Sequence, residues 1–552
     1  MIPTRLKFHA LLATCLMTLQ ASALEKFQSA DVVVYGDSPS AFIAAIELAE
    51  SRHDVLLVSP EPHVGGMMVE GLGYQDIDSR SGNGAPIGGL AAEFYLRIAR
   101  DYSPGTSTPH YRFEAKVTER VIDAWLLVKV VRQLRGKRIS EAAGSVHIEG
   151  GKITSFRVED GTIIAGKVFI DGTVEGDLMA LAGVTHTHWR EGNATYNENV
   201  GGVINPTSHD QYNVNVDPCI IPGNPASGVI PGVQDETVGI HGSADDSGMG
   251  YCLRLPLTRN PANKIPITAP PGYSAGQYER YRRFLAAGGS NNWLDGPGSI
   301  DSSTTTTLFD LGSWHNLSGN FYGINHAYPN GTYAQREQVY QEHKSFTQGL
   351  IHYLSTDPGV PASIRNEWSR WGLPAEEFTD TGGWPRLLYV RCARRTIADY
   401  VIRNGSVYNE GAYIDYTNYR PFGIPYRSMI PKRADCSNLL VPSALSSSYA
   451  GYGAVRLEWT YMVLGQSAGI AAALAVDGGT PVQDVSYDAL KTLRLARAQR
   501  LSLVSEEVPG GAEVMVDNAE ELATAGITAP SLSPAFRSGR CGTDKKPFLI
   551  NN

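Results

Sequence analysis

The hydrophobic pattern near the start of the chain predicts a strand, a turn, a helix and a second strand in close succession. Residues 31–35 form a short apolar run rich in β-branched valine, which is typical of a buried parallel strand. Gly36 ends this run, residues 41–50 indicate a helix of small residues, and residues 55–58 form the second apolar run. This order predicts a βαβ unit of the kind that seats a dinucleotide.

Less regular patterns follow along the rest of the chain. Residues 201–310 are rich in Gly, Pro, Asn and Ser with little periodicity, which favours loops and an irregular cap. Residues 424–475 again indicate strand and helix, and residues 510–552 form a polar tail. The other predicted elements are helices over residues 112–134, 333–356, 361–371 and 389–403, and short strands over residues 145–148, 153–158, 162–164 and 168–170.

The turn after the first predicted strand approximates the G-x-G-x-x-G/A fingerprint of dinucleotide sites, as Gly36-Asp37-Ser38-Pro39-Ser40-Ala41. Unpaired N–H groups and the dipole at the start of the helix would stabilise a pyrophosphate there. Ser38 replaces the second glycine and offers a hydroxyl to a phosphate. Ser59 falls where a carboxylate for the adenosine ribose is usual, with Glu61 two residues on. Alone, this motif also fits an ordinary βαβ unit.

Two later stretches predict further places where backbone approaches a nucleotide. In residues 168–183 a strand ends at Asp171-Gly172-Thr173, and a helix opens after it. In residues 456–475 the run Gly465-Gln466-Ser467-Ala468-Gly469 leads into a helix of small residues, whose positive end could face developing negative charge. Each stretch alone also indicates tight helix–sheet packing, whereas three such elements along one chain favour a nucleotide site.

With these stretches, the chain resembles the FAD-dependent oxidoreductase family of the glutathione-reductase-type two-dinucleotide fold, and within it the xanthan-lyase-like branch. The resemblance covers roughly residues 30–500 and does not specify a substrate. It implies an α/β fold, in which a Rossmann-like FAD-binding domain with a parallel sheet carries an inserted mixed α+β substrate or cap domain. The matching stretches are VVVYGDSPSA, HVGGMMVEGLG, FIDGTVEGDLMALAGV, WPRLLYVRCARR, IPYRSMIPKRADCSNLLVPSALS and MVLGQSAGIAAALA.

The texture of the sequence divides the chain into parts, and the resemblance implies a set of residues for FAD. The expected parts are a signal peptide over residues 1–23, the FAD-binding domain over residues 24–200 and 386–500, the substrate or cap region over residues 201–385, and a tail over residues 501–552. The implied FAD contacts are Gly36, Ser38, Pro39, Ser40 and Ala41 at the pyrophosphate, Ser59 or Glu61 at the adenosine ribose, Gly65, Gly66 and Met67 along the ribityl–flavin side, Asp171, Gly172, Thr173 and Asp177 at the second nucleotide contact, and Gly465, Gln466, Ser467 and Ala468 at the flavin and pyrophosphate.

The chain departs from the family pattern at four positions. Gly172 stands where alanine is usual, and Cys392 stands where a glutamate is expected in the R-x-A-R-R stretch. Tyr449 stands where many relatives have histidine, and Ser59 replaces an acid. These departures leave the inherited mechanism open.

Hydride transfer to flavin N5 also needs a group that takes a proton from the substrate, usually a histidine. His315 and His326 are candidates from a region rich in aromatic and polar residues, although each also fits a structural histidine. Tyr449 could exchange a proton with the substrate or simply pack in a loop. Arg391 and the two arginines after it could polarise a carbonyl, bind a carboxylate, or form salt bridges on one helical face.

Composition and charge limit the partners and the cellular location that we expect. The 552 residues carry a formal charge of −9 without a basic stripe, which argues against a nucleic-acid partner. Residues 1–23 predict a secretory signal, with Arg5 and Lys7 before an apolar stretch and a small-x-small cleavage site. No other run approaches a membrane span. Four glycosylation sequons fit this route, at Asn193, Asn316, Asn330 and Asn404.

Cysteine spacing shows no metal motif, and Cys219–Cys252 is the disulfide that a shared loop-rich region favours. No second complete dinucleotide fingerprint appears, and a secreted enzyme would meet little reduced nicotinamide, so O2 is the expected electron acceptor. The sequence therefore predicts a secreted FAD-dependent oxidase acting on an alcohol, a sugar or a natural product. The alternatives are a non-redox flavoprotein (an isomerase, lyase or cyclase) and a binding protein with a decayed nucleotide site.

Overall fold

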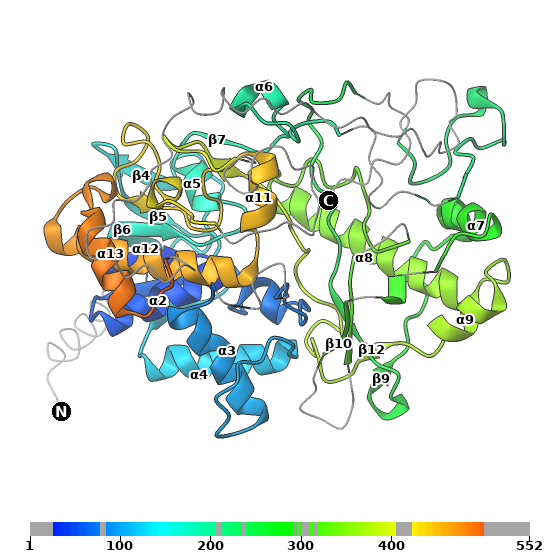
Figure 1. The fold of residues 1–552 in the computed structure, drawn as a ribbon, viewed down its shortest axis with the longest axis horizontal. Coiled ribbons are helices and arrows are strands. Elements are labelled where there is room, and N and C mark those ends of the chain that lie inside the picture. The colour runs from blue at the N-terminus through cyan, green and yellow to red at the C-terminus, as the bar shows by residue number, and fades with distance from the viewer. Residues whose placement is uncertain are drawn as a thin grey trace, which may run out of the picture.

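The computed structural model describes residues 26–501, except residues 78–83, 85, 205–211, 213, 235–238, 292, 296, 301–307, 314–316 and 404–421. The predicted signal peptide, the tail beyond residue 501, the candidate His315 and the sequons at Asn316 and Asn404 lie outside the described residues. Figure 1 shows two lobes. One combines the blue-to-cyan first part of the chain with its orange last part, and the other is formed by the green middle part.

A mostly parallel sheet forms the centre of the first lobe. Its described strands are β1 (Phe27–Tyr35), β2 (Val55–Val58), β3 (Arg132–Leu134), β4 (Val146–Glu149), β5 (Lys152–Arg157), β6 (Ile163–Asp171) and β14 (Leu439–Leu440). They follow the order β3-β2-β1-β6-β5-β4, and β14 also pairs with β6. All neighbours are parallel except β4–β5 and β5–β6. The predicted Rossmann-like α/β fold is confirmed.

Both faces of this sheet are buried, which explains the continuous apolar run of β1. Val32 and Val34 enter one core, while Val33 and Tyr35 enter the core on the opposite face. The α-helices that share the first of these cores are α2 (Pro39–Glu50), α3 (Gly89–Tyr102), α4 (Ala115–Val128), α11 (Tyr449–Val455), α12 (Glu458–Gly478) and α13 (Tyr487–Ala496).

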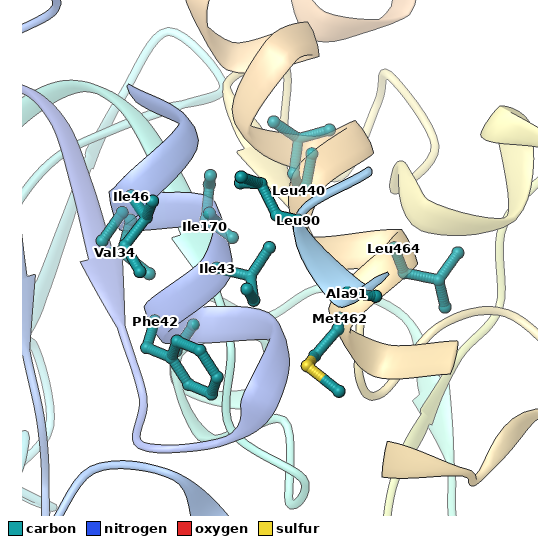
Figure 2. Close-up of a cluster of buried hydrophobic side chains, with 14 of the residues drawn as sticks. Val34, Phe42, Ile43, Ile46, Leu90, Ala91, Ile170, Leu440, Met462 and Leu464 are labelled. Carbon is teal, nitrogen blue, oxygen red and sulfur yellow. The ribbon is translucent and has the colours of Figure 1, made fainter. Parts of the chain in front are cut away.

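Helix α12 packs directly on α2 inside this core (Figure 2). Gly465 and Gly469 lie one turn apart and allow the two backbones to approach closely. A Cβ at Gly465 would lie 2.3 Å from the Ser40 carbonyl oxygen, and one at Gly469 would lie 3.0 Å from that of Ala44. Within the described residues, α12 alone is long and apolar enough to cross a membrane, and most of it is buried in this core.

The second lobe has its own hydrophobic core beside the long helix α8 (Tyr333–Thr356). A capping box starts α8, because the Thr332 hydroxyl accepts from the Gln335 N–H and the Gln335 side chain accepts from the Thr332 N–H. The other principal elements of this lobe are the antiparallel strands β8 (Leu255–Leu257), β10 (Pro297–Ile300) and β11 (Leu308–Leu311) and the helices α7 (Glu279–Ala286) and α9 (Ala362–Trp368). The inserted part is thus mixed α+β, as predicted.

Short elements complete the described chain. They are the strands β7 (His186–Thr187), β9 (Lys264–Ile265), β12 (Leu373–Pro374) and β13 (Arg395–Thr396), the helices α5 (Asp177–Leu181), α6 (Asn193–Tyr196) and α11 (Tyr449–Val455), and the 3-10 turns η1 (Gly66–Val69), η2 (Pro225–Ser227), η3 (Pro261–Asn263), η4 (Ala275–Tyr278), η5 (Trp293–Asp295), η6 (Tyr426–Met429) and η7 (Val482–Asp484).

Three predicted elements differ from the structure. The predicted helix over residues 112–134 ends at Val128, because residues 132–134 pair with β2 as strand β3. The two short strands predicted within residues 162–170 are one strand, β6, since β1 pairs with it over almost its whole length. The predicted helix over residues 389–403 is wrong, because this segment is irregular apart from the two residues of β13.

The predicted Cys219–Cys252 disulfide is also wrong. Cys219 is disulfide-bonded, whereas Cys252 is a free and buried thiol. Its sulfur accepts a hydrogen bond from the Arg391 guanidinium, and its backbone pairs with Tyr389. Cys252 therefore belongs to the contact between the two lobes rather than to a loop-stabilising bridge.

Candidate functional site

The stretches that the sequence assigned to a nucleotide meet at the start of α2. Gly36 has a φ of +141°, and a Cβ there would lie 2.3 Å from the Gly172 carbonyl carbon and 2.7 Å from the Thr173 nitrogen. A Cβ at Gly172 would lie 2.7 Å from that of Ala41. The turns after β1 and β6 are thus packed backbone to backbone, and only glycine fits at these two positions.

The Gly-Gly loop crosses the same place. The Gly65 N–H donates to the Asp37 carbonyl oxygen at 2.7 Å. A Cβ at Gly66 would lie 3.2 Å from both the Ser38 Cα and the Pro39 side chain. Met67 follows in η1 with little exposure. The predicted ribityl–flavin stretch, residues 65–67, therefore lies directly against the predicted pyrophosphate turn.

The start of α2 has the donors that an anionic diphosphate requires. Ser38 is the N-cap residue and makes no side-chain capping bond. Within the described residues, the backbone N–H groups of Ser38 and Ser40 donate to no partner. Unpaired N–H groups at the positive end of a helix stabilise an anion. These residues fit the diphosphate of a dinucleotide through their backbone.

The Ser38 hydroxyl, by contrast, is not free for the predicted bond to a phosphate. It lies 3.0 Å from the Ser40 hydroxyl and 3.1 Å from that of Ser443, which are themselves 2.7 Å apart. Three hydroxyls have three protons, and a closed triangle of hydrogen bonds uses them all. All three side chains are fully buried. The serine that replaces the second glycine therefore joins α2 to the segment after β14.

Of the two residues predicted at the adenosine ribose, Glu61 is the better placed. Ser59 is fully buried, and its hydroxyl donates to the Glu61 carbonyl oxygen two residues later. The Glu61 carboxylate accepts from Arg138 at 2.8 Å and remains partly exposed. Burial, followed by the negative charge of Glu61, raises the pKa of Asp37, which places Glu61 close to the first turn.

The Asp171 and Thr173 side chains build the second turn. Asp171 accepts hydrogen bonds from the Thr173 N–H and hydroxyl and from the Met179 N–H. Thr173 in turn accepts from the Asp177 N–H at 3.0 Å. Burial raises the pKa of Asp171 to about 7. Only the backbone of this turn is left for the predicted nucleotide contact.

Asp177 has a different partner from the one predicted. Its carboxylate accepts from Arg336 at 2.9 Å through each oxygen and from Arg394 at 2.8 Å. The opposing arginine charges outweigh burial and lower the pKa of Asp177. The three side chains are largely buried. The Asp177 carboxylate therefore links α5 to α8 in the second lobe, and the contact of Asp177 with the cofactor stays a prediction.

The run from Gly465 to Ala468 lies inside α12 and does not open the helix as predicted. The Gln466 side chain accepts from the Leu90 N–H at 3.1 Å and donates to Glu47 at 2.9 Å. Ser467 donates to the Val463 carbonyl oxygen, and Ala468 is fully buried. These side chains pack α12 against α2 and α3. The positive end of α12 lies at Glu458 instead.

Among the catalytic candidates, Tyr449 is the first residue of α11. Its N–H donates to Glu191 at 2.9 Å, and its hydroxyl is buried with no hydrogen-bond partner in the described part of the chain. Burial raises its pKa, so the hydroxyl stays protonated near neutral pH and acts as a donor rather than a base. His326 is half-buried in the turn before α8.

The three arginines after Tyr389 do not share a helical face. Arg391 donates to the Gly250 carbonyl oxygen and the Ser313 hydroxyl. Arg394 pairs with Asp177 as described, and Arg395 donates to Glu191 at 2.6 Å. Each guanidinium therefore reaches a different segment.

The thiol that replaces the expected glutamate is bonded to one of these arginines. Arg395 donates to the Cys392 sulfur at 3.1 Å. Burial raises the pKa of Cys392, which keeps the thiol neutral. Glu191 supplies the carboxylate that neutralises Arg395.

Sequence reasoning missed a group of polar side chains at the start of α12. The Arg456 side chain makes no hydrogen bond or ion pair within the described residues, and its Nε is buried. The Trp459 indole N–H is likewise buried and unpaired. Glu458 is 7% exposed without a hydrogen-bond partner in the described chain, and burial with the charge of Asp76 raises its pKa to about 8. The only sequence signal was an arginine and a glutamate just before the apolar helix.

The family model described as FAD dependent oxidoreductase matches residues 31–416 and 404–493. No curated protein matches the chain. Solved structures are similar to parts of it. THI4 of Thermovibrio ammonificans is 15% identical with a TM-score of 0.22, over 33% of this chain and 74% of that one.

Two further structures have smaller shared parts. OTEMO in complex with FAD and NADP is 14% identical with a TM-score of 0.19, over 26% of this chain and 25% of that one. The bacillithiol disulfide reductase Bdr (YpdA) of Staphylococcus aureus is 11% identical with a TM-score of 0.18, over 26% of this chain and 38% of that one. The chain thus spans less than two thirds of these two proteins.

Proposed function

Because this chain belongs to the FAD-dependent oxidoreductase family, we propose that it is a secreted oxidase that passes electrons from an organic substrate to molecular oxygen. FAD is its cofactor and supplies the two-electron chemistry. The main support for this proposal is the group of backbone N–H donors at the start of α2. These donors have no partner within the described residues, so they can bind a diphosphate.

The residues around this turn give the proposed binding mode. The backbone of Ser38 and Ser40 would bind the diphosphate, and the Glu61 carboxylate would bind the adenosine ribose. The loop of residues 65–67 would lie along the ribityl chain. The buried and protonated Tyr449 hydroxyl could donate a hydrogen bond to a substrate oxygen.

The architecture of the second lobe supports oxygen as the electron acceptor. Its sheet is the antiparallel set β10-β11-β8, flanked by α7, α8 and α9. A nicotinamide dinucleotide is usually seated by a parallel βαβ unit. Molecular oxygen, the acceptor that we propose, needs no such dinucleotide-binding unit.

Two features support the secretory route. The first 23 residues have the charge and apolar pattern of a signal peptide. Cys219 is disulfide-bonded, and disulfides persist mainly in oxidising compartments. Mass spectrometry of the protein from its native culture medium would test this, with a mature amino terminus near residue 24 as the expected result.

The oxidase proposal is tested by spectroscopy and stoichiometry. The purified protein is expected to be yellow, to bleach under anaerobic reduction by its substrate, and to recover colour in air. Peroxide formed or oxygen consumed should equal product. Product formed without net oxygen uptake would instead indicate a non-redox flavoprotein, and a colourless protein that cannot be reconstituted with FAD would defeat the proposal.

A further inference from the structure

Tyr389 lies among charged side chains from four separate segments. Its N–H donates to the Cys252 carbonyl oxygen at 2.8 Å, at the contact between the lobes. The Arg391 guanidinium lies 4.8 Å from the centre of its ring, and that of Arg254 lies 5.7 Å away. Arg456 and Asp76 are also close enough to act on its ionisation.

The three guanidinium groups around this ring are neutralised to different degrees. Arg254 pairs with the buried Asp310 at 2.7 Å. Arg391 donates to the Gly250 carbonyl oxygen, the Ser313 hydroxyl and the Cys252 sulfur, and none of these acceptors is a carboxylate. One positive charge beside Tyr389 therefore has no direct counter-ion in the described residues.

The Arg456 guanidinium differs further, because it has no hydrogen bond or ion pair within the described residues. Arg190, Arg336 and Arg395 are largely buried, and each bonds to a carboxylate or to carbonyl oxygens. Arg456 is half-buried, but its Nε is buried, and a buried donor without a partner destabilises the protein. A ligand that accepts from Arg456 would recover this loss.

The nearby carboxyl groups do not balance the two arginines. Asp76 is exposed. Glu458 is protonated at neutral pH, because its pKa lies at about 8. Neither the Arg391 nor the Arg456 guanidinium has a carboxylate partner within the described residues, which leaves a positive site beside Tyr389. The Trp459 indole N–H, three residues after Arg456, is a further buried donor with no partner in the described part of the chain.

We propose that Tyr389, Arg391 and Arg456 bind a carboxylate group of the organic substrate. A planar guanidinium matches a carboxylate with two parallel hydrogen bonds. This inference rests on the proposed function and narrows its substrate to an organic acid. A carboxylate held here would satisfy Arg456 and balance the surplus charge in one step.

Ligand titration of the FAD-loaded protein tests the proposal. The probes are acetate against acetamide and benzoate against benzamide, followed by calorimetry and by the flavin absorption spectrum. We expect at least one carboxylate to bind tenfold or more tightly than its amide. A charge-assisted bond contributes about 1.5–3 kcal/mol, so Arg456→Gln should weaken carboxylate binding about 10–100-fold and leave amide binding unchanged. Arg456→Lys should retain part of the affinity.

Two controls separate this role from others. Arg370→Gln removes an exposed arginine that pairs with Glu367 in the second lobe, and should change nothing. Arg456→Gln should unfold at or above the wild-type temperature, since no bond is lost, and should keep its full FAD content. Loss of stability, loss of FAD, or equal binding of carboxylates and amides by the wild type would each overturn the proposal.

The proposed oxidase function is tested separately. Dithionite-reduced protein reoxidised by air reports on the reaction with oxygen without any substrate acid. Rapid reoxidation in both the wild type and Arg456→Gln, with no carboxylate preference, would reject the anion site alone. Slow reoxidation with a clear carboxylate preference would reject the oxidase alone.

Discussion

The start of α2 and the start of α12 both present the positive end of a helix, yet their side chains are bonded differently. Around α2 the Ser38, Ser40 and Ser443 hydroxyls bond to one another, and only backbone N–H groups stay free. At the start of α12, the side chains of Arg456 and Glu458 have no hydrogen-bond partner within the described residues. Side chains that are all hydrogen-bonded to one another hold their geometry without a ligand. Side chains without partners gain their hydrogen bonds only when a ligand binds.

The largest expected effect comes from removing the buried ion pairs that Asp177 makes with two arginines. Asp177→Asn leaves Arg336 and Arg394 buried without their shared counter-charge. We expect the free energy of unfolding to fall by about 3–5 kcal/mol, measured by chemical denaturation. The matched control is Asp160→Asn, which breaks an exposed pair with Lys137 and should cost less than about 1 kcal/mol. Similar losses in both variants would contradict the argument.

A second prediction concerns the contact that joins the two regions. Gly465→Ala places a methyl group 2.3 Å from the Ser40 carbonyl oxygen, and should destabilise the protein by about 2 kcal/mol through overpacking. The control is Gly453→Ala in α11, where a Cβ meets nothing within 4 Å. That change should be neutral or stabilise by about 0.5–1 kcal/mol. Thermal unfolding of both variants decides the point.

A third prediction uses the unbonded Glu458. Its pKa is about 8 in the folded protein and near 4.5 in the unfolded chain, so the folded state holds a proton that the unfolded state releases. Stability should therefore fall as pH rises from about 5 to about 8. Glu458→Gln should reduce this fall by about 3 kcal/mol, measured by denaturation at both pH values. An unchanged pH dependence would mean that Glu458 is ionised or solvated in the folded protein.

The smallest expected effect tests the hydroxyl triangle. Ser443→Ala removes one member and should cost about 0.5–1.5 kcal/mol. FAD affinity should change little, because the free donors at α2 belong to the backbone. A large loss of FAD with little loss of stability would show that the Ser38 hydroxyl depends on Ser443 to hold the cofactor.

The features that the sequence predicted correctly depend on local signals. Gly36 and the apolar runs of β1 and β2 encode a tight turn between buried strands, and they predicted the Rossmann-like seat. The start of α12 was misplaced at Gly465, since a glycine inside a helix looks like a boundary until the backbone of α2 is seen against it. The contacts of FAD itself stay predictions.

The parts that were missed depend on long-range contacts. Asp177 and Arg336 are 159 positions apart in the sequence. No hydrophobic periodicity predicts that two such distant residues form an ion pair. The arginines at 391, 394 and 395 have helical spacing, but each is bonded to a distant segment and the helix does not form. Arg456 could not be singled out, because a missing partner is visible only in three dimensions.

Glu458 and Gly465 are seven residues apart on one helix. Seven residues make almost two full turns, so both positions face nearly the same direction about 10 Å apart along the axis. The glycine fixes α12 to α2, and the glutamate stands at a set offset from that anchor. Inserting one residue between them would rotate the amino end by about 100° while leaving the anchor in place. An insertion or deletion between Glu458 and Gly465 would therefore disturb this arrangement more than most substitutions of the residues between them.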